Sequence, residues 1–292
     1  LITVVFSMLG CFILLSMVAF VLAIPLFGVS VSQLIQFFET GGFQENLELL
    51  KYFQSVQSLG MFVLPPFVIA WLYSRNPAGY LKIKVSPALS SYFYVLALIF
   101  FSLPFISFLS QLNQDISFPE SLEKIENWLM NKEESANELT QKFLSADNWK
   151  GLLVNVIMVG VLPAIGEEFI FRGLIQRIFS RWTRNVHLGI LITAFFFSAM
   201  HIQFYGLIPR FFLGVLFGYF MLWSGSIWLP VFGHFVNNTS AVVYFYFSSK
   251  VNFQPERYDS MNLPDSAVFI SVVLIVLLSF LLYYSENRLR NS

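Results

Sequence analysis

Long apolar segments without charged residues recur along the chain and indicate its architecture. Segments of about 20 apolar residues, the length that crosses the hydrocarbon core of a bilayer, alternate with shorter polar connections, and the segment 1–38 contains no charged side chain. We predict about eight membrane spans, at 3–27, 58–75, 91–111, 151–171, 187–203, 207–223, 227–247 and 266–284. The predicted fold class is therefore all-α, a polytopic transmembrane helix bundle.

The composition supports a membrane environment. Hydrophobic residues make up 57% of the chain and charged residues 12%, and the mean hydropathy is +0.69. This leaves too little polar surface to cover a water-soluble globule of 292 residues. The formal net charge is zero, so we expect the lipid bilayer as a partner and no nucleic acid. The single cysteine, Cys11, excludes an intrachain disulfide and a cysteine-cluster metal site.

The distribution of charge predicts an orientation. The segments 75–84 and 177–184 each carry three basic residues and no acid, whereas 112–150 carries eight acids against four lysines and 39–51 is also acidic on balance. Because loops rich in Lys and Arg stay in the cytoplasm, we place the acidic segments outside. We expect a multi-pass protein of the bacterial inner membrane with both termini in the cytoplasm.

Three regions are predicted along the chain. Residues 1–150 would hold the N-terminal membrane helices and, at 112–150, an acidic amphipathic segment outside the membrane. Residues 151–247 would form the core that carries the chemistry, and 248–292 a last membrane helix with a short cytoplasmic tail. Apolar residues at helical spacing within 119–146 predict helices on the outer surface, either as a cap on the bundle or as a substrate gate or docking site for a protein partner.

Ionisable side chains inside predicted spans are the candidates for chemistry. Each costs about 2.5 to 3.5 kcal/mol on insertion, so such residues are functional candidates by default. The chain has few of them in or at the ends of its spans, together with two amides: Glu167, Glu168, Arg172, His201, Arg210, His234, Asn237 and Asn238.

Helical geometry separates the two adjacent acids. Glu168 and Arg172 stand four residues apart, so on a helix they share a face and can form an ion pair in the favoured acid-before-base order. Glu167 points about 100° away from Glu168. It has no local partner and should face a polar cavity, where it could serve as a base or a metal ligand. A buried network of all three charges is the alternative.

The two histidines have polar or aromatic neighbours one helical turn away. His201 follows Phe197 by four residues, so an aromatic ring can pack under the imidazole; the alternative is an interfacial histidine at a helix end. His234 shares a face with Asn238, and Asn237 is the competing partner. With the predicted orientation, His201 lies near the outer end of a short span, away from Glu167 and His234. We therefore expect shifted span boundaries or a connection 202–209 that enters the bundle.

Three motifs in this order resemble one family. Glu-Glu-x-x-x-Arg at 167–172, Phe-x-x-x-His at 197–201 and His-x-x-x-Asn at 234–238 look like the CPBP intramembrane proteases, which include the CAAX prenyl endopeptidases and the bacteriocin-processing or immunity proteins of the Abi family. The likeness covers about 151–247. It implies that the catalytic residues are Glu167, His201, His234 and Asn238, and that Glu168 and Arg172 form a supporting pair.

The resemblance implies an intramembrane endopeptidase that hydrolyses a peptide bond in a membrane-associated or lipidated protein or peptide. Two mechanisms fit. In the preferred one, which requires no cofactor, Glu167 and His201 activate a water while His234 and Asn238 stabilise the oxyanion. In the other, Glu167, His201 and His234 hold a catalytic zinc ion, as in a metalloprotease.

Other functions make different demands on the same residues. A non-proteolytic scaffold or immunity partner of the same fold would not need Glu167 for turnover, and a proton-coupled transporter would use the buried charges as a relay. A rhomboid-type serine protease would need a nucleophilic serine paired with a histidine, for which the Ser224 and Ser226 turn is a poor context. An aspartyl protease is excluded because no Asp lies inside a predicted span.

Overall fold

The computed structural model describes residues 1–39, 46–116, 118–250 and 263–291, and every regular element in these ranges is helical. Part of the predicted acidic stretch 39–51, one position of 112–150 and much of the connection within 248–292 lie outside the described residues. The elements are α1 (Ile2–Phe27), α2 (Val31–Glu39), α3 (Leu47–Ser58), η1 (Leu59–Val63), α4 (Leu64–Tyr73), α5 (Pro77–Tyr80), α6 (Leu89–Gln114), η2 (Glu120–Leu122), α7 (Glu123–Leu144), α8 (Trp149–Asn155), η3 (Val156–Val161), α9 (Leu162–Ile170), η4 (Phe171–Ile175), α10 (Gln176–Trp182), α11 (Val186–Ala199), η5 (Phe204–Gly206), α12 (Leu207–Ser224), α13 (Trp228–Lys250) and α14 (Asp265–Asn291).

A helix stands at each of the eight predicted spans, and six of these helical segments are long and apolar enough to cross a membrane. They are Ile2–Phe27, Leu47–Tyr73, Leu89–Gln114, Trp149–Trp182, Phe204–Ser224 and Asp265–Arg290. The other two predicted spans correspond to α11, which has only 14 residues, and α13, whose 23 residues include a histidine and two asparagines. The predicted count of eight is therefore approximate.

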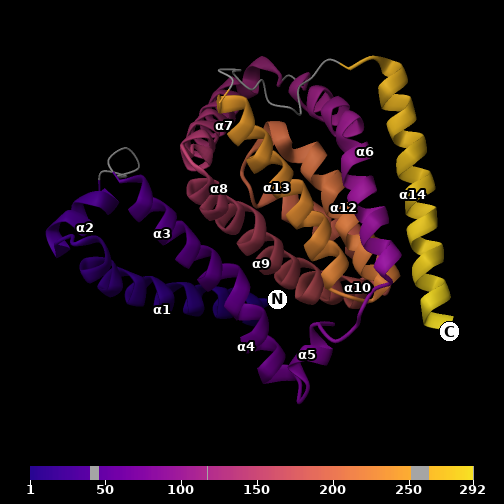
Figure 1. Ribbon diagram of the computed structural model, residues 1–292, viewed down its shortest axis with the longest axis horizontal. Helices are drawn as coiled ribbons and strands as arrows, with labels where there is room; N and C mark the ends of the chain where they lie inside the picture. Colours follow the sequence, from indigo (N-terminus) through magenta and orange to yellow (C-terminus); the bar gives the residue numbers. More distant parts are fainter. Residues whose placement is uncertain (40–45, 117, 251–262, 292) are drawn as a thin grey trace.

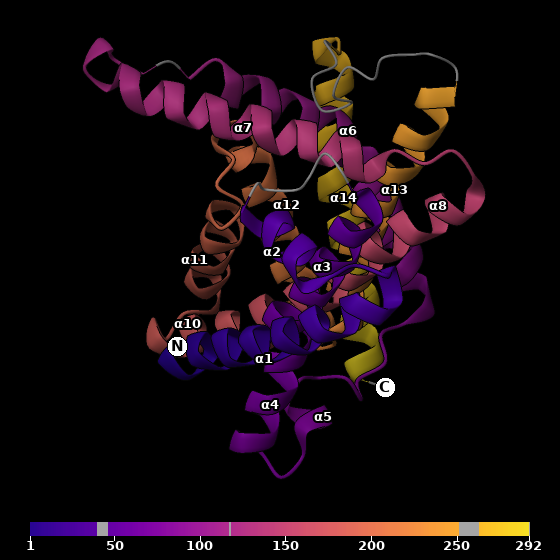
Figure 2. The same cartoon turned by 90° about the vertical axis from the view of Figure 1, so that its left-hand side faces the viewer.

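The helices form a bundle with one helix laid across its end. α14 packs along α6, α11 packs against α10 and α12, and α9 packs against α13 and η1. α1 runs beside α3 and α4 at one side of the bundle (Figure 1). Figure 2 shows α7 lying across the end of the bundle, roughly perpendicular to α6 and α14. The central helices α9, α12 and α13 carry most of the candidate chemistry.

Side chains explain where several helices begin and end. Four helices follow an asparagine whose side-chain oxygen accepts a hydrogen bond from a first-turn N–H group, which satisfies a donor that has no partner inside the helix. These residues are Asn46, Asn76, Asn148 and Asn185. At the other end, α1 and α12 stop at Gly28 and Gly225, whose positive φ angles of 64° and 63° favour glycine.

Short π-helical turns interrupt the helix that carries the two acids. The helical segment Trp149–Trp182 spans 34 residues, and within it η3 and η4 flank α9 on both sides. Such turns occur mostly as single insertions in α-helices and are frequent at functional sites. Each changes the angular position of the residues that follow, so the faces presented by α8, α9 and α10 do not follow one 3.6-residue period.

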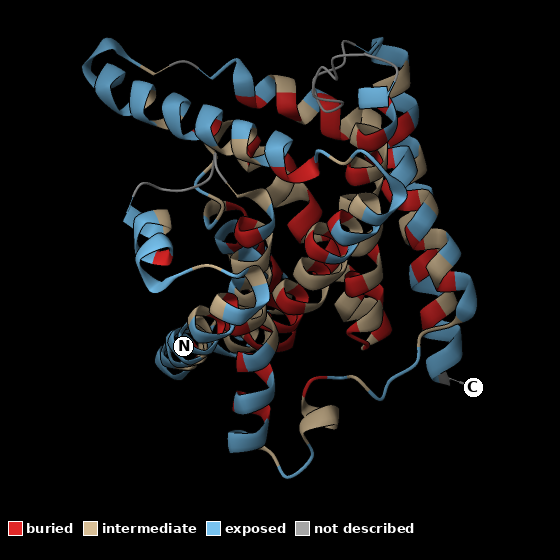
Figure 3. Ribbon diagram, turned by 60° about the vertical axis from the view of Figure 1, so that its left-hand side comes forward, coloured by how far each residue is buried: buried red, intermediate tan, exposed pale blue. Residues whose placement is uncertain are grey.

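Charge is separated between the two ends of the bundle. α5, α10 and the C-terminal end of α14 lie at one end, and α7 lies at the other (Figure 1). Buried residues gather in the central helices, while α7 is largely exposed (Figure 3). The predicted helix within 119–146 is present as α7. The basic segments 75–84 and 177–184 thus lie opposite the acidic segment; which end faces the cytoplasm stays a prediction.

Candidate active site

Glu168 is the centre of a buried polar network. Its Oε1 atom lies 3.0 Å from Nη1 of Arg172 and 2.8 Å from Nδ1 of His234, and the residue is 0% exposed. The ion pair with Arg172 is the one that the four-residue spacing predicts. The contact with His234 was not predicted, because it joins α9 to α13, 66 residues further along the chain. Glu168 therefore orients the His234 ring as well as compensating Arg172.

Arg172 is held by aromatic rings and a backbone carbonyl in addition to Glu168. Its Nη2 atom donates to the carbonyl oxygen of Gly214 at 2.9 Å. Its Cζ atom lies 4.8 Å from the ring centroid of Phe197 and 5.5 Å from that of Phe217. Desolvated cation–π contacts of this kind are worth about 2 kcal/mol. The guanidinium is therefore fixed on several sides without a second carboxylate.

A pair of glycines brings α12 close enough to receive these donors. Gly214 and Gly218 are one turn apart, and the carbonyl of Gly218 accepts a hydrogen bond from Nε2 of Gln176 at 3.2 Å. A Cβ atom at Gly218 would lie 2.6 Å from Cγ2 of Ile190 on α11. Small residues four apart allow this close approach of membrane helices. The four-residue spacing of Gly214 and Gly218 is the signal in the sequence that indicates this close contact.

Glu167 is the carboxylate that the network leaves available. Oε2 of Glu167, like Oε2 of Glu168, is buried and has no hydrogen-bond partner in the part of the chain that the structure describes, but only Glu168 contacts other side chains through its Oε1 atom. Glu167 lies close enough to interact electrostatically with His234, Arg172 and Arg210. Helical geometry predicted this division of roles between the two adjacent acids. A buried carboxylate without a partner is costly, and such a group is suited to bind a water or a substrate atom.

His201 has a defined tautomer and shares an aromatic ring with His234. Its Nδ1 atom lies 2.9 Å from the carbonyl oxygen of Phe197, and because a carbonyl only accepts, Nδ1 carries the proton and a neutral ring has its lone pair on Nε2. The Phe197 ring centroid is 5.4 Å from that of His201 and 5.8 Å from that of His234.

The two histidines lie against one aromatic ring, and the boundary of the predicted span 187–203 is shifted, as we expected. α11 ends at Ala199, and the residues after it turn back through Ile202, which has a φ of 52°, into η5. Asn113 on α6 holds this turn by donating to the carbonyl of Phe204 and accepting from the N–H group of Ile208. The structure brings His201 and His234 against the ring of Phe197. The helix α11 ends at Ala199, before the end of the predicted span 187–203.

Asn238 is joined to the helix of the two acids. Its Nδ2 atom donates to the carbonyl oxygen of Val159 at 3.0 Å. Pro163, four residues after Val159, has no N–H group to donate to this oxygen, so the asparagine supplies a donor there. Asn237 donates in turn to Oδ1 of Asn238 at 3.2 Å. Asn238 rather than Asn237 therefore faces η3, and one of its two N–H groups is engaged.

Arg210 is a site residue to which sequence reasoning assigned no role. It lies close enough to interact electrostatically with both Glu167 and His201, and its guanidinium donates to the carbonyl and the side-chain oxygen of Gln203 at 3.2 and 2.5 Å. A charged residue within a predicted span was the available signal. Its position beside Glu167 follows only from the packing of α12 against the other helices.

The residues proposed as zinc ligands are not assembled as a metal site. Among the residues that the structure describes, no three His, Cys, Asp or Glu side chains are grouped so that they could hold a metal ion. Nδ1 of each histidine is engaged, by Phe197 for His201 and by Glu168 for His234, so a metal would bind through Nε2, and metal-bound histidines commonly make such second contacts. The triad of Glu167, His201 and His234 is not grouped as a ligand set in the described residues, and a zinc ion there stays a prediction.

Comparison with known proteins finds a family model that matches the region of this site. Residues 149–240 match the family model described as type II CAAX prenyl endopeptidase, Rce1-like. An uncharacterised 24.3 kDa protein of Escherichia coli is 29% identical over 97 residues, which cover 32% of this chain and 45% of that protein, less than half of its length. No solved structure gives a significant match. The match over 149–240 contains all three motifs, and it confirms that this chain carries the CPBP family resemblance that they predict.

Proposed function

We propose that the chain is an intramembrane endopeptidase that hydrolyses a peptide bond in a membrane-associated or lipidated protein or peptide. The observation that carries the proposal is the division between the adjacent acids. Glu168 uses its Oε1 atom to contact Arg172 and His234, whereas the Glu167 side chain forms no hydrogen bond or ion pair within the described residues. The match to a CAAX prenyl endopeptidase model supports a protease, and six apolar helices support a membrane setting.

Glu167 and His201 would activate the attacking water. With its proton on Nδ1, His201 offers the Nε2 lone pair to one hydrogen of the water, while the Glu167 carboxylate removes the other proton. The water oxygen forms a bond to the scissile carbonyl carbon as the carbon–oxygen π bond opens to an oxyanion. Glu167 then returns the proton to the leaving amine as the carbon–nitrogen bond breaks.

His234 and Asn238 would stabilise the oxyanion. Asn238 has one N–H group that is not engaged by Val159. His234 donates Nδ1–H to Glu168, so donation from Nε2 requires a doubly protonated ring. In that form its charge balances Glu167, as Arg172 balances Glu168. Donors of this kind typically contribute about 10²- to 10³-fold each to the rate.

Metal dependence can be tested directly. The zinc-dependent alternative uses Glu167, His201 and His234 as ligands, each histidine through the Nε2 atom that its present Nδ1 hydrogen bond leaves available. Cleavage is measured after exhaustive chelation, with residual zinc determined by elemental analysis. We expect full turnover at a metal-free site. Loss of turnover that zinc alone restores would favour the alternative.

The central test is Glu167→Gln. Membrane proteomes of cells that produce the wild type or this variant are compared by labelling new peptide N-termini, and the cleaved protein is then assayed with purified enzyme in proteoliposomes. We expect roughly a 10³-fold loss of cleavage with no loss of folded protein. Glu138→Gln on the exposed face of α7 is the matched control. Equal cleavage by Glu167→Gln and wild type would leave a scaffold role, and loss of proton-coupled flux would indicate a transporter.

A further inference from the structure

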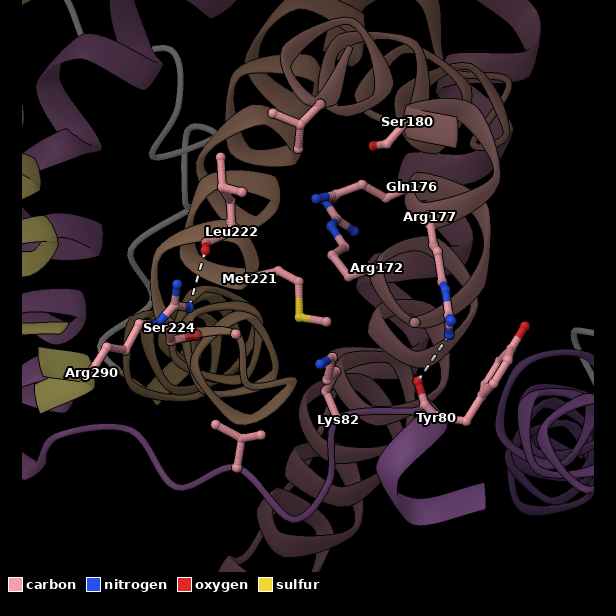
Figure 4. Close-up of a pocket in the computed structure, with 14 residues that line it drawn as sticks. Tyr80, Lys82, Arg172, Gln176, Arg177, Ser180, Met221, Leu222, Ser224 and Arg290 are labelled. Atoms are coloured by element: carbon pink, nitrogen blue, oxygen red, sulfur yellow. Dashed lines mark hydrogen bonds between the residues drawn. The ribbon is translucent and has the colours of Figure 1, made fainter. Parts of the chain in front are cut away.

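A second site lies at the end of the bundle opposite α7. A pocket of about 620 Å³ opens between α10, α12, the C-terminal end of α14 and the connection that follows α5. We call it the basic pocket and define it by Tyr80, Lys82, Arg172, Gln176, Arg177 and Arg290. In Figure 4, Arg290 and Arg177 lie on opposite sides of the pocket and Lys82 lies between them.

Three of the four cations in this pocket have no acidic partner among the described residues, and the fourth, Arg172, is paired with Glu168. No Asp or Glu lines the pocket, and none of Lys82, Arg177 and Arg290 forms an ion pair within the described ranges. Arg177 donates to the carbonyl of Tyr80 at 3.5 Å and its Cζ atom lies 4.3 Å from that ring's centroid. Arg290 donates to the carbonyl of Leu222 at 3.2 Å. Since a guanidinium has five donors and an ammonium three, most donors remain available.

The inner wall of the pocket adds buried polar atoms without partners. Arg172 is 2% exposed and Gln176 is 6% exposed, and both line the pocket. Nε of Arg172 and Oε1 of Gln176 are buried and have no hydrogen-bond partner among the described residues. The two atoms make the inner wall polar, but because they are buried, a ligand in the pocket would contact the exposed cations in front of them.

The surroundings place the pocket at the level of lipid headgroups. Aromatic residues stand at the same helix ends: Trp182 closes α10, Trp223 precedes the last residue of α12, and Tyr283 and Tyr284 lie near the end of α14. Trp182 is 76% exposed and Tyr284 60%. Exposed Trp and Tyr residues are enriched where membrane meets water. The pocket also has an apolar wall that includes Met221, Leu222 and Val186.

We propose that the basic pocket binds the phosphate of an anionic phospholipid headgroup. Three uncompensated cations from three separate segments can surround one phosphate, and guanidinium groups match its geometry with paired donors. Basic pockets between helix ends on the cytoplasmic side of a membrane are typical sites for such headgroups. The exposed aromatic residues and the apolar wall favour a lipid over a free phosphate ion. The site is separate from Glu167 and His201, so it does not depend on the proposed protease activity.

Matched double variants test the proposal. The full chain is purified in detergent and its binding to dihexanoyl phosphatidylglycerol, dihexanoyl phosphatidylcholine and inorganic phosphate is measured by titration calorimetry. Lys82→Gln with Arg290→Gln removes two cations from the pocket. Lys84→Gln with Arg288→Gln makes the same change in charge two residues away in the same segments, at exposed positions that do not line the pocket. Thermal unfolding checks that both double variants are folded.

The expected result is selective. Wild type and the Lys84/Arg288 variant bind phosphatidylglycerol equally and more tightly than phosphatidylcholine, and the Lys82/Arg290 variant binds it about tenfold or more weakly. An equal loss in both double variants would mean general surface attraction and overturn the proposal. Inorganic phosphate binding as tightly as phosphatidylglycerol would overturn the lipid assignment. A raised KM for peptide cleavage without any lipid effect would assign the pocket to the substrate instead.

Discussion

The core network, formed by Glu168, Arg172 and His234, and the basic pocket differ in how their positive charges are compensated, although Arg172 belongs to both. In the core, Arg172 and His234 share the carboxylate of Glu168. In the pocket, Lys82 and Arg290 have no carboxylate partner within the described residues. The difference follows from solvation. A charge buried among helices must be compensated by the protein itself, whereas a charge at the end of the bundle can be compensated by water or lipid phosphate.

Removing the shared carboxylate gives the largest expected contrast in stability. Glu168→Gln removes the carboxylate that forms the ion pair with the buried Arg172, and we expect the free energy of unfolding in detergent micelles to fall by about 3 kcal/mol. Lys82→Gln, which also removes one charge, should change it by no more than about 0.5 kcal/mol because the residue is exposed.

A second substitution sharpens this test. Adding Arg172→Met to Glu168→Gln removes the uncompensated charge and should recover part of the lost stability, although cleavage stays low because His234 loses its charged partner. If Glu168→Gln were as stable as Lys82→Gln, the core network would not depend on internal compensation, and the contrast between the two regions would fail.

The next effect concerns catalysis within the core. Asn238→Ala removes a proposed oxyanion donor and the contact with Val159, and we expect cleavage to fall by about 10²-fold. Asn237→Ala removes only the donor to Asn238 and should cost less than about tenfold. Initial rates with the wild-type substrate in proteoliposomes measure both. A greater loss for Asn237→Ala would exchange the roles of the two amides.

The smallest effect concerns the helix contact between the two regions. Gly218→Ala places a Cβ atom 2.6 Å from Ile190, so α11 and α12 must separate, and we expect a loss of about 1 to 2 kcal/mol in stability. Gly10→Ala is the control, because nothing lies within 4 Å of its added carbon. Thermal unfolding in the same detergent compares the two. Equal stability would show that the 214–218 contact is not tightly packed.

Helices and contacts between residues close in the sequence could be predicted from the sequence alone. Long apolar segments predicted helices at all eight positions, and the spacing of Glu168 and Arg172 predicted their ion pair. Polar residues also explain why the span count was only approximate. α13 is a helix of 23 residues, but it contains His234, Asn237 and Asn238. These polar residues of the candidate site lower the mean hydropathy of the helix, which is the property that identifies a membrane span.

The sequence by itself determined the membrane setting, the helical class and the separation of Glu167 from Glu168, because these depend on hydropathy and on geometry within one helix turn. Only the tertiary structure decided that Glu168 also holds His234 and that Lys82 and Arg290 share a pocket with Arg172. These contacts join segments 66 or more residues apart. They depend on how helices pack and on π-helical turns that change which face a residue occupies, and no local pattern in the sequence specifies either.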